Sequence, residues 1–372
     1  MKNRIKVIIS GGGTGGHIFP AIAIANAIKK RFNDAEILFV GANGRMEMKR
    51  VPDACYKIVG LNISGLQRKI TLKNILKNLI FPYKVLKSLY DAKKIVKEFK
   101  PDIAIGVGGY ASGPTIRMAA SLNIPTLIQE QNSYPGITNK MLAAKANTIC
   151  VAYDNMERFF PKNKIVKTGN PVRADILNIQ PKSIEGYKFF EFNPNLKTIV
   201  VIGGSLGSKT INQSIEVSIP EFIKNNIQVI WQTGEFYYKN MINNVEYLSK
   251  KGIKVVPFIN RMDYLYSIAD LVVSRAGALS ISEICCLGKT SILIPSPNVS
   301  EDHQTKNAMV LANSNAAVMI SDNEANTKLT NIAIDLINNE LKLKEIGINA
   351  KKLALFNSDE LIVDEITKLL KL

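Results

Sequence analysis

The chain has 372 residues, of which 46% are hydrophobic, and it carries a formal net charge of +17. That length is sufficient for two domains of ordinary size, each with its own hydrophobic core. The apolar run near the basic N-terminus is too short for a signal peptide, and no segment approaches the length of a membrane span, so we expect a protein of the cytoplasm. The positive charge indicates an anionic partner: nucleic acid, an acidic lipid surface or a phosphorylated substrate.

Metal chemistry finds little support in the composition. The chain has four cysteines without C-x-x-C spacing and only two histidines. We therefore expect buried, reduced thiols and no metal site. No cofactor is expected either, because the sequence contains no recognisable cofactor-binding site. The residues concerned are Cys55, Cys150, Cys285, Cys286, His17 and His303.

Short β-branched runs alternate with helix-like segments in two series. The first series is Lys6–Ser10, Ile37–Val40, Ile103–Val107, Thr126–Gln129 and Thr148–Ala152. The second is Thr198–Ile202, Gln228–Gln232, Lys254–Pro257, Leu271–Ser274 and Ser291–Ile294. This alternation predicts an α/β fold with two doubly wound, Rossmann-like domains of parallel strands that face a cleft.

The boundary between these domains is expected after the segment GNPVR, where strand patterning lapses. The N-terminal domain would then cover residues 1–173 and the C-terminal domain residues 174–354. A last helix, at about residues 355–372, has the length to pack back on the first domain.

The first glycine loop, SGGGTGGH, contains the dinucleotide spacing G-x-G-x-x-G after the first strand. A dinucleotide site also needs an acid at the end of the second strand, and that strand ends in FVGAN; Glu47 comes later. We therefore interpret the loop as a backbone cradle for a bulky anion at a helix N-terminus. His17 lies at its mouth, where a proton acceptor would be useful.

Two later segments have related features. In GGSLGSK, Ser208 separates the last glycine from Lys209, so the segment is not a P-loop, and Ser205 is a candidate donor to phosphate. In SRAGALSISEI, Gly277 and Ala278 let a helix begin close to the cleft. Taken alone, Glu283 is expected on a solvated face of that helix.

Eight segments together resemble one family, the MurG family of N-acetylglucosaminyltransferases that convert lipid I to lipid II in peptidoglycan synthesis. A single glycine loop is weak evidence, whereas the ordered set is specific. In chain order the segments are GGGTGGHIFPA, ISGLQRK, GVGGYASGP, QEQNSYPGITNK, GNPVR, GGSLG, RAGALSISEI and DHQTKNA.

The resemblance implies a glycosyltransferase of GT-B architecture with UDP-N-acetylglucosamine as donor. Its acceptor would be undecaprenyl-pyrophosphoryl-N-acetylmuramoyl-pentapeptide (lipid I), glycosylated with inversion on the 4-hydroxyl. The N-terminal domain would meet the acceptor and the membrane, and the C-terminal domain the UDP-sugar. The resemblance also implies a peripheral protein on the cytoplasmic face of the cell membrane, serving cell-wall synthesis, cell shape and cell division.

The same resemblance implies two sets of substrate-binding residues. Around the donor sugar and the acceptor diphosphate would lie Thr14, Gly15, Gly16 and Asn132. At the UDP end, the resemblance implies Arg173 and Ser205, with Ile259 at uracil and Glu283 at the ribose. Along the diphosphate would lie Gly277, Ala278, Leu279, Ser280, Ile281 and Ser282. The sugar hydroxyls would be contacted by Gln304 or, as the alternative, by His303.

Inverting transfer needs a base for the acceptor proton and donors for the charge that develops on UDP. His17 is the first candidate for the base and Glu130 the second, and Tyr110 is a candidate acceptor-site residue. Gln129 stands where some relatives have histidine, so that position is not an essential base. Helix N-termini can supply the donors without a metal, and the chain has no D-x-D motif.

The segment from Leu61 to Lys100 is basic and apolar at once. Amphipathic helices account for part of it, but it has more apolar residues than one buried face requires. We expect it to dock on the anionic inner leaflet. Its basic residues are Arg68, Lys69, Lys73, Lys77, Lys84, Lys87, Lys93, Lys94, Lys97 and Lys100, against the acids Asp91 and Glu98.

Three other functions remain as alternatives. A nucleic-acid-binding protein would suit the charge, but the chain lacks a basic strand with interleaved aromatic residues, so we expect no nucleic-acid partner. A related UDP-sugar glycosyltransferase with another glycolipid acceptor would share the donor motifs. An NAD-dependent oxidoreductase is disfavoured by the missing acid.

Overall fold

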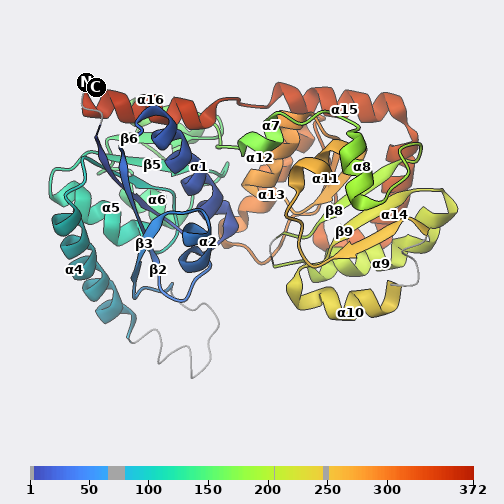
Figure 1. The fold of residues 1–372 in the computed structure, drawn as a ribbon, viewed down its shortest axis with the longest axis horizontal. Coiled ribbons are helices and arrows are strands. Elements are labelled where there is room, and N and C mark those ends of the chain that lie inside the picture. Colours follow the sequence, from blue (N-terminus) through green and yellow to red (C-terminus); the bar gives the residue numbers. More distant parts are fainter. Residues whose placement is uncertain (1–3, 66–79, 205, 246–250) are drawn as a thin grey trace. The chain divides into compact units, whose positions relative to one another are not determined.

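The computed structural model of the protein describes residues 4–65, 80–204, 206–245 and 251–372 (Figure 1). The chain divides into two compact units. The first contains the chain up to Pro171 together with Asn357–Leu372, and the second is Val172–Phe356. The chain thus passes from the first unit to the second after Pro171, whereas the boundary was predicted after Arg173. Arg173 therefore belongs to the second unit.

In the described part of the first unit, seven parallel strands form one sheet in the order β3-β2-β1-β4-β5-β6-β7. The strands are β1 (Lys6–Ser10), β2 (Glu36–Ala42), β3 (Lys57–Leu61), β4 (Ile103–Gly106), β5 (Thr126–Glu130), β6 (Thr148–Val151) and β7 (Ile165–Lys167). The helices are α1 (Gly15–Arg31), α2 (Glu47–Asp53), α4 (Phe81–Phe99), α5 (Ser112–Ser121), α6 (Ile137–Leu142) and α16 (Ser358–Leu370), with short 3-10 turns at Met156–Arg158 and Lys162–Lys164.

Helices cover both faces of this sheet, which is why its central strands are continuous apolar runs. Val7 and Ile9 of β1 point to the layer formed by α1, α2 and α16. Ile8, between them, points to the opposite layer of α4, α5 and α6. Alternate residues of one strand therefore supply two separate cores.

The described part of the second unit repeats this plan with six parallel strands in the order β10-β9-β8-β11-β12-β13. The strands are β8 (Thr198–Ile202), β9 (Gln228–Gln232), β10 (Ile253–Val256), β11 (Leu271–Ser274), β12 (Ser291–Leu293) and β13 (Val318–Met319). The helices are α7 (Ala174–Leu177), α8 (Ile184–Phe190), α9 (Lys209–Lys224), α10 (Glu235–Val245), α11 (Met262–Ile268), α12 (Ala278–Leu287), α13 (His303–Asn313), α14 (Ala325–Asn338) and α15 (Glu340–Lys352), with 3-10 turns at Ser300–Asp302 and Asp322–Glu324.

Helices α9 and α14 pack side by side on one face of the second sheet, joined by a ladder of small polar side chains. The bonded residues recur every four positions along α9 and along α14 with the 3-10 turn that precedes it, so the two helices run in the same direction. The three bonds join Thr210 to Asp322, Ser214 to Asn326 and Ser218 to Thr330, at 2.9, 2.6 and 2.7 Å.

The predicted class, two α/β domains with parallel sheets, is confirmed. All ten predicted strands are present, with ends that differ by at most two residues. The prediction missed β3, β7 and β13. These three strands lie at sheet edges, where partial exposure removes the continuous apolar run that marks a central strand.

The C-terminal helix α16 lies against α1 in the first unit, although the chain reaches it from the second (Figure 1). Ile362, Val363 and Ile366 are buried in the same core as the inner face of α1. Two ion pairs, Lys30 with Glu360 and Arg31 with Asp364, join the outer faces of the two helices at 3.0 Å each. Because both pairs are exposed, the apolar contact supplies most of the stabilisation.

We expect Ile362→Ala to lower the free energy of unfolding of the first unit by about 2–4 kcal/mol, because a fully buried side chain is truncated. The adjacent Leu361 is 40% exposed, so Leu361→Ala is the matched control with a loss below about 1 kcal/mol. Chemical denaturation followed by circular dichroism measures both. Equal losses for the two variants would contradict the packing of α16 on α1.

Candidate functional site

Each sheet has a switch point where the strand order reverses, the place at which open α/β sheets bind ligands. In the first unit it lies between β1 and β4, whose following loops are Gly11–Thr14 and Val107–Gly109. The two loops touch through their backbones: a Cβ on Gly109, whose φ is +85°, would lie 2.4 Å from the carbonyl oxygen of Gly12. Only glycine at position 109 permits this approach.

His17 lies in the first turn of α1 and is half-buried at this switch point. Its Nδ1 atom is 3.0 Å from the carbonyl oxygen of Gly12 and 3.4 Å from Thr14 Oγ1. Because a carbonyl only accepts hydrogen bonds, Nδ1 carries a hydrogen, and in the neutral imidazole the lone pair is then on Nε2. Nε2 points towards Gly108, where a Cβ would lie 2.8 Å from it. The ring is therefore oriented to accept a proton at Nε2.

Thr14 is the N-cap of α1, and Gly15 and Gly16 are its first two residues. The first N–H groups of a helix have no acceptor within the helix. The first turn of α1 contains no acidic side chain, so its positive end is not neutralised from within the helix. The predicted anion-binding character of this helix start is consistent with that geometry.

Glu130 is buried at the end of β5, and its carboxylate accepts four hydrogen bonds. Oε1 accepts from the backbone and the side-chain amide of Asn132, at 3.0 and 3.1 Å. Oε2 accepts from Gly136 N and Asn139 Nδ2, at 3.1 and 2.8 Å. Burial raises the pKa of the carboxyl group, and these donors oppose that rise. Glu130 therefore shapes the loop that presents Asn132, and this geometry favours His17 as the base.

Tyr110 follows the β4 loop and is about half exposed. Its ring lies on the backbone of Gly65, where a Cβ would be 2.1 Å from the ring. Gly65 is the last described residue before the segment that contains several predicted membrane-contacting lysines. The structure thus places Tyr110 beside the loop of His17 and against Gly65.

The switch point of the second unit lies between β8 and β11. After β8, Gly207 approaches the next loop so closely that a Cβ would lie 2.0 Å from the carbonyl oxygen of Thr233. Gln232 donates to Gly204 O at 3.1 Å and accepts from Ile259 N at 3.2 Å. The N–H of Ile259, predicted to contact uracil through its backbone, is therefore already bonded within the protein. Ser205, the predicted phosphate donor, lies outside the described residues.

Glu283 is buried on α12, so the expectation of a solvated helix face was wrong. Its Oε2 accepts from Tyr266 Oη at 2.9 Å, and its Oε1 lies 3.6 Å from Arg173 Nη2. Burial raises the pKa of Glu283, and the positive charge of Arg173 opposes the rise. Two residues predicted for the UDP end, Arg173 and Glu283, thus contact each other directly.

The N-terminus of α12 can contact a ligand through backbone N–H groups. Gly277 is the N-cap, and Ala278 to Ser282 form the first turns after it. Ile281 is buried in the core and Ser282 Oγ donates back to Ala278 O at 3.0 Å, so this segment offers a ligand mainly its first N–H groups and the half-exposed Leu279 and Ser280.

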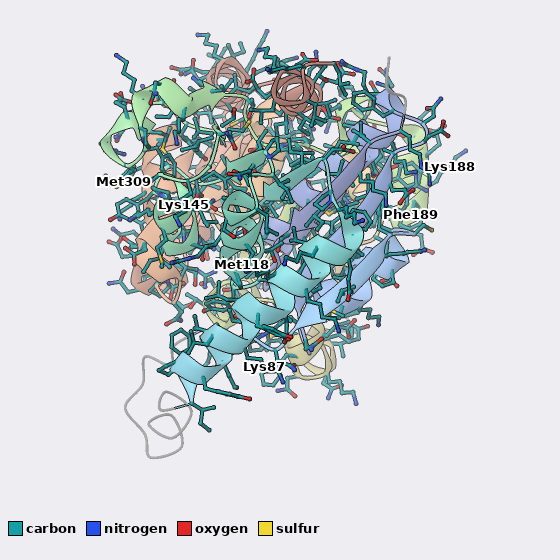
Figure 2. The ribbon with its side chains drawn as sticks, turned by 90° about the vertical axis from the view of Figure 1, so that its left-hand side faces the viewer. Lys87, Met118, Lys145, Lys188, Phe189 and Met309 are labelled. Atoms are coloured by element: carbon teal, nitrogen blue, oxygen red, sulfur yellow. The ribbon has the colours of Figure 1, made fainter. Side chains whose placement is uncertain are left out.

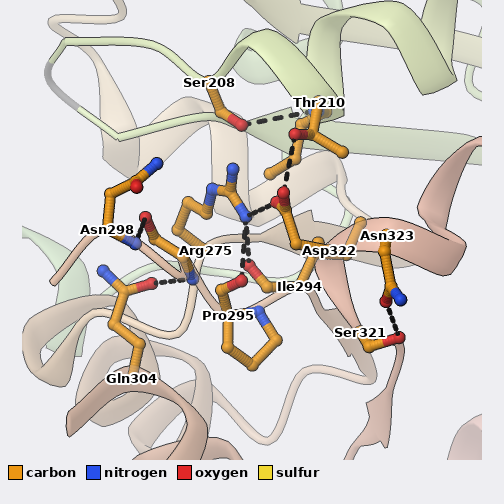
Figure 3. A network of polar contacts seen from close by, with 12 residues as sticks. Ser208, Thr210, Arg275, Ile294, Pro295, Asn298, Gln304, Ser321, Asp322 and Asn323 are labelled. Carbon is orange, nitrogen blue, oxygen red and sulfur yellow. Dashed lines mark hydrogen bonds and ion pairs between the residues drawn. The ribbon is translucent and has the colours of Figure 1, made fainter. Parts of the chain in front are cut away.

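Arg275 joins three loops at this edge of the second sheet (Figure 3). Its Nη1 donates to Ile294 O and Pro295 O at 3.0 Å each and pairs with Asp322 Oδ1 at 2.5 Å. Asp322 also accepts from Thr210 Oγ1, at the start of α9, at 2.9 Å. The ends of β11 and β12 and the start of α9 are thereby fixed relative to one another.

Gln304 lies at the margin of this network (Figure 3). Its Oε1 accepts the N–H of Ser296, the residue after the Pro295 carbonyl that Arg275 holds, at 2.9 Å. The predicted sugar-contacting residue is therefore oriented by the same group of loops.

Four residues of the two sites were missed from the sequence or given no role there: Glu47, Gln232, Arg275 and Asp322. Arg275 stands inside a recognised motif, which is a signal that could have been used. Glu47 was considered only as a ribose ligand. Its carboxylate instead turns inwards and accepts from Gly13 N at 2.8 Å. Gln232 and Asp322 carry no local sequence signal.

Two searches of the described ranges bear on metals and membranes. No group of three or more His, Cys, Asp and Glu side chains with metal-binding geometry occurs in them. None of their helices has the length and hydropathy to span a bilayer.

Comparison with known proteins gives consistent matches over the whole chain. Residues 7–151 match the glycosyltransferase family 28 N-terminal domain, and residues 198–361 match the family 28 C-terminal domain. A protein of Parabacteroides distasonis is 54% identical over 367 residues, 99% of each chain, and one of Flavobacterium psychrophilum is 50% identical over 368 residues, 99% of this chain and 98% of its own. Both are named UDP-N-acetylglucosamine–N-acetylmuramyl-(pentapeptide) pyrophosphoryl-undecaprenol N-acetylglucosamine transferase.

A solved structure matches as well. The crystal structure of Acinetobacter baumannii MurG has a TM-score of 0.77 and 29% identity, covering 98% of this chain and 99% of its own. The motifs, the fold and the full-length matches agree: the chain belongs to glycosyltransferase family 28 and, within it, to the MurG family of N-acetylglucosaminyltransferases.

Proposed function

We propose that this chain transfers N-acetylglucosamine from UDP-N-acetylglucosamine to the 4-hydroxyl of lipid I, giving lipid II for peptidoglycan synthesis. The observation that carries the proposal is the identity of about half of all residues, over 99% of the chain, with relatives whose names state this transfer. The two switch points support it, because each has glycine-lined backbone and a helix N-terminus, which are features that favour anion binding.

In the proposed reaction, the acceptor hydroxyl attacks the anomeric carbon while UDP leaves from the opposite face. His17 Nε2 takes the hydroxyl proton, because Gly12 O already holds the hydrogen on Nδ1. The N–H groups at the start of α12 stabilise the charge that develops on the UDP phosphate. Glu283 accepts hydrogen bonds from the ribose hydroxyls, and Gln304 contacts the sugar.

The decisive assay measures sugar transfer from UDP-N-acetylglucosamine to a short-chain lipid I analogue, with another glycolipid as the alternative acceptor. Turnover with the lipid I analogue is expected. Preference for the other glycolipid would assign a different acceptor to the same fold, and no transfer to either would overturn the proposal.

His17→Ala is expected to lower kcat by about 100- to 10,000-fold, because it removes the proton acceptor. Glu130→Gln is the comparison variant, since it replaces one acceptor oxygen of a saturated carboxylate with a donor. We expect Glu130→Gln to lower the free energy of unfolding by about 1–3 kcal/mol. Its kcat should fall much less than that of His17→Ala. Loss of kcat in Glu130→Gln with full activity in His17→Ala would reverse the assignment of the base.

Glu283→Ala is expected to weaken UDP binding by about 10- to 100-fold, the effect of losing hydrogen bonds to a charged group. Because burial raises the pKa of Glu283, its carboxylate becomes protonated at a higher pH than an ordinary glutamate. On acidification, the UDP affinity of the native protein should therefore fall at a higher pH than an ordinary glutamate would require, and it should fall further than the affinity of Glu283→Gln does. Calorimetric titrations at several pH values test this, and identical pH dependence in the two proteins would contradict it.

We also propose that α4 contacts the anionic membrane. Its inner face buries Ser88, Ala92 and Val96. At about 100° per residue, the opposite face presents a stripe of exposed apolar side chains. They are Ile80, Tyr83, Leu86 and Tyr90, exposed by 52, 65, 68 and 71%.

Lysines accompany these apolar side chains on α4, and Figure 2 labels one of them, Lys87. Those classed as exposed are Lys87, Lys93, Lys94, Lys97 and Lys100. Pro82 does not break the helix, because it occupies the first turn, where its missing N–H costs nothing. Apolar insertion and lysine attraction therefore act on one surface. The remaining predicted residues of this region, within 66–79, lie outside the described chain.

Reversal of Lys87, Lys93, Lys94 and Lys97 to glutamate is expected to weaken binding to anionic vesicles by up to about 1,000-fold, at about 1 kcal/mol per lysine. The matched control reverses four exposed lysines of α15, Lys342, Lys344, Lys351 and Lys352. Vesicle co-sedimentation measures both. An equal loss in the control would indicate an effect of net charge alone, and unchanged binding in the α4 variant would refute the surface.

A further inference from the structure

Glu47 is a buried carboxylate for which the proposed reaction has no role. It is the first residue of α2, and only 1% of it is exposed. Its Oε2 accepts the N–H of Gly13 at 2.8 Å, and its Oε1 accepts the N–H of Ala42 at 3.0 Å. One side chain therefore joins the loop after β1 to the end of β2. Burial of a carboxylate is costly unless donors compensate it, and here two backbone donors do.

The backbone around Glu47 leaves space for this carboxylate. A Cβ on Gly12 would lie 2.2 Å from both Cδ and Oε1 of Glu47. A Cβ on Gly41, in β2, would lie 2.6 Å from its Cγ. A side chain at Gly12 or at Gly41 would thus clash with Glu47, so both positions need glycine to leave room for the buried carboxyl group.

The same loop holds the imidazole of His17. Gly12, which lies against the Glu47 carboxylate through its Cα, accepts the hydrogen of His17 Nδ1 with its carbonyl oxygen. Gly13, the next residue, is held by Glu47 through its N–H. The direction of the Gly12 carbonyl, and with it the tautomer of His17, therefore depends on a peptide segment that Glu47 fixes.

We propose that Glu47 is a positioning residue for His17. It fixes the glycine loop so that the Gly12 carbonyl keeps the hydrogen on Nδ1 and leaves Nε2 as the basic nitrogen. Its effect on the tautomer stands by itself, and its effect on turnover rests on the proposed function.

Glu47→Gln tests this proposal with little change of shape. A glutamine can accept from only one of the two N–H groups, because its other end is itself a donor. The chain has only two histidines, so nitrogen-15 NMR of the imidazoles can be assigned with His17→Ala. We expect His17 to be the Nδ1–H tautomer in the native protein and to gain a substantial Nε2–H population in Glu47→Gln.

A second variant guards against failure to fold. Gly41→Ala keeps the carboxylate but pushes its Cγ from the other side, and Gly41 has no positive φ that would strain an alanine. It should shift the His17 tautomer in the same direction. Asp53→Asn, an exposed acid on the same helix, is the control and should leave the tautomer unchanged. An Nε2–H tautomer in the native protein, or an unchanged one in both test variants, would overturn the proposal.

Kinetics provide the second readout. Misplacement of the base by Glu47→Gln should lower kcat by up to about 100-fold. The KM for UDP-N-acetylglucosamine should stay within about threefold, because the residues expected at the UDP end, Arg173 and Glu283 among them, belong to the other unit. A rise in KM with unchanged kcat would contradict a positioning role. Failure of the native protein to turn over would count against the proposed function, while the tautomer measurement would still decide the role of Glu47.

Discussion

Both candidate sites depend on direct contact between backbones at the carboxyl edge of a parallel sheet. Gly109 lies against the carbonyl of Gly12 in the first unit, and Gly207 lies against that of Thr233 in the second. A side chain at either glycine would separate the loops by at least the width of a methyl group. In the first unit this contact joins the loops after β1 and β4, and in the second it joins the loops after β8 and β9. Because the loop after β1 or β8 leads into a helix N-terminus beside the switch point, the glycine contact helps to fix where backbone donors can meet a ligand.

In loops that contact one another in this way, some backbone N–H and C=O groups have no partner in a strand, and buried side chains form hydrogen bonds with them. Each of these side chains has the donors or acceptors that its backbone partners require. Glu47 and Glu130 meet only donors, and each is a carboxylate. Gln232 must donate to Gly204 O and accept from Ile259 N, which requires an amide. Acidic residues near the sites therefore need not act on substrate, and Glu130 is best understood in this way.

The sequence predicted those features that depend only on neighbouring residues in the chain. Central strands are buried on both sides and read as apolar runs, whereas edge strands such as β3 and β7 have exposed positions and do not. Glycine loops and His17 were visible because motif and position coincide. The burial of Glu283 and the contacts of Glu47 were not, because they depend on residues brought together only by the fold, such as Tyr266 and Gly13.

The pairing of Arg173 with Glu283 has a consequence for binding. Burial alone would favour the neutral form of Glu283, which is a poor acceptor for two hydroxyl groups. Arg173 opposes that effect from 3.6 Å, and Tyr266 fixes the other oxygen at 2.9 Å, so the carboxylate is held in one orientation before a ligand arrives. A side chain ordered during folding loses no further rotamer entropy on binding. For the ribose contact proposed above, the polar contacts of Glu283 within the protein would thus orient the carboxylate in advance rather than compete with the ligand.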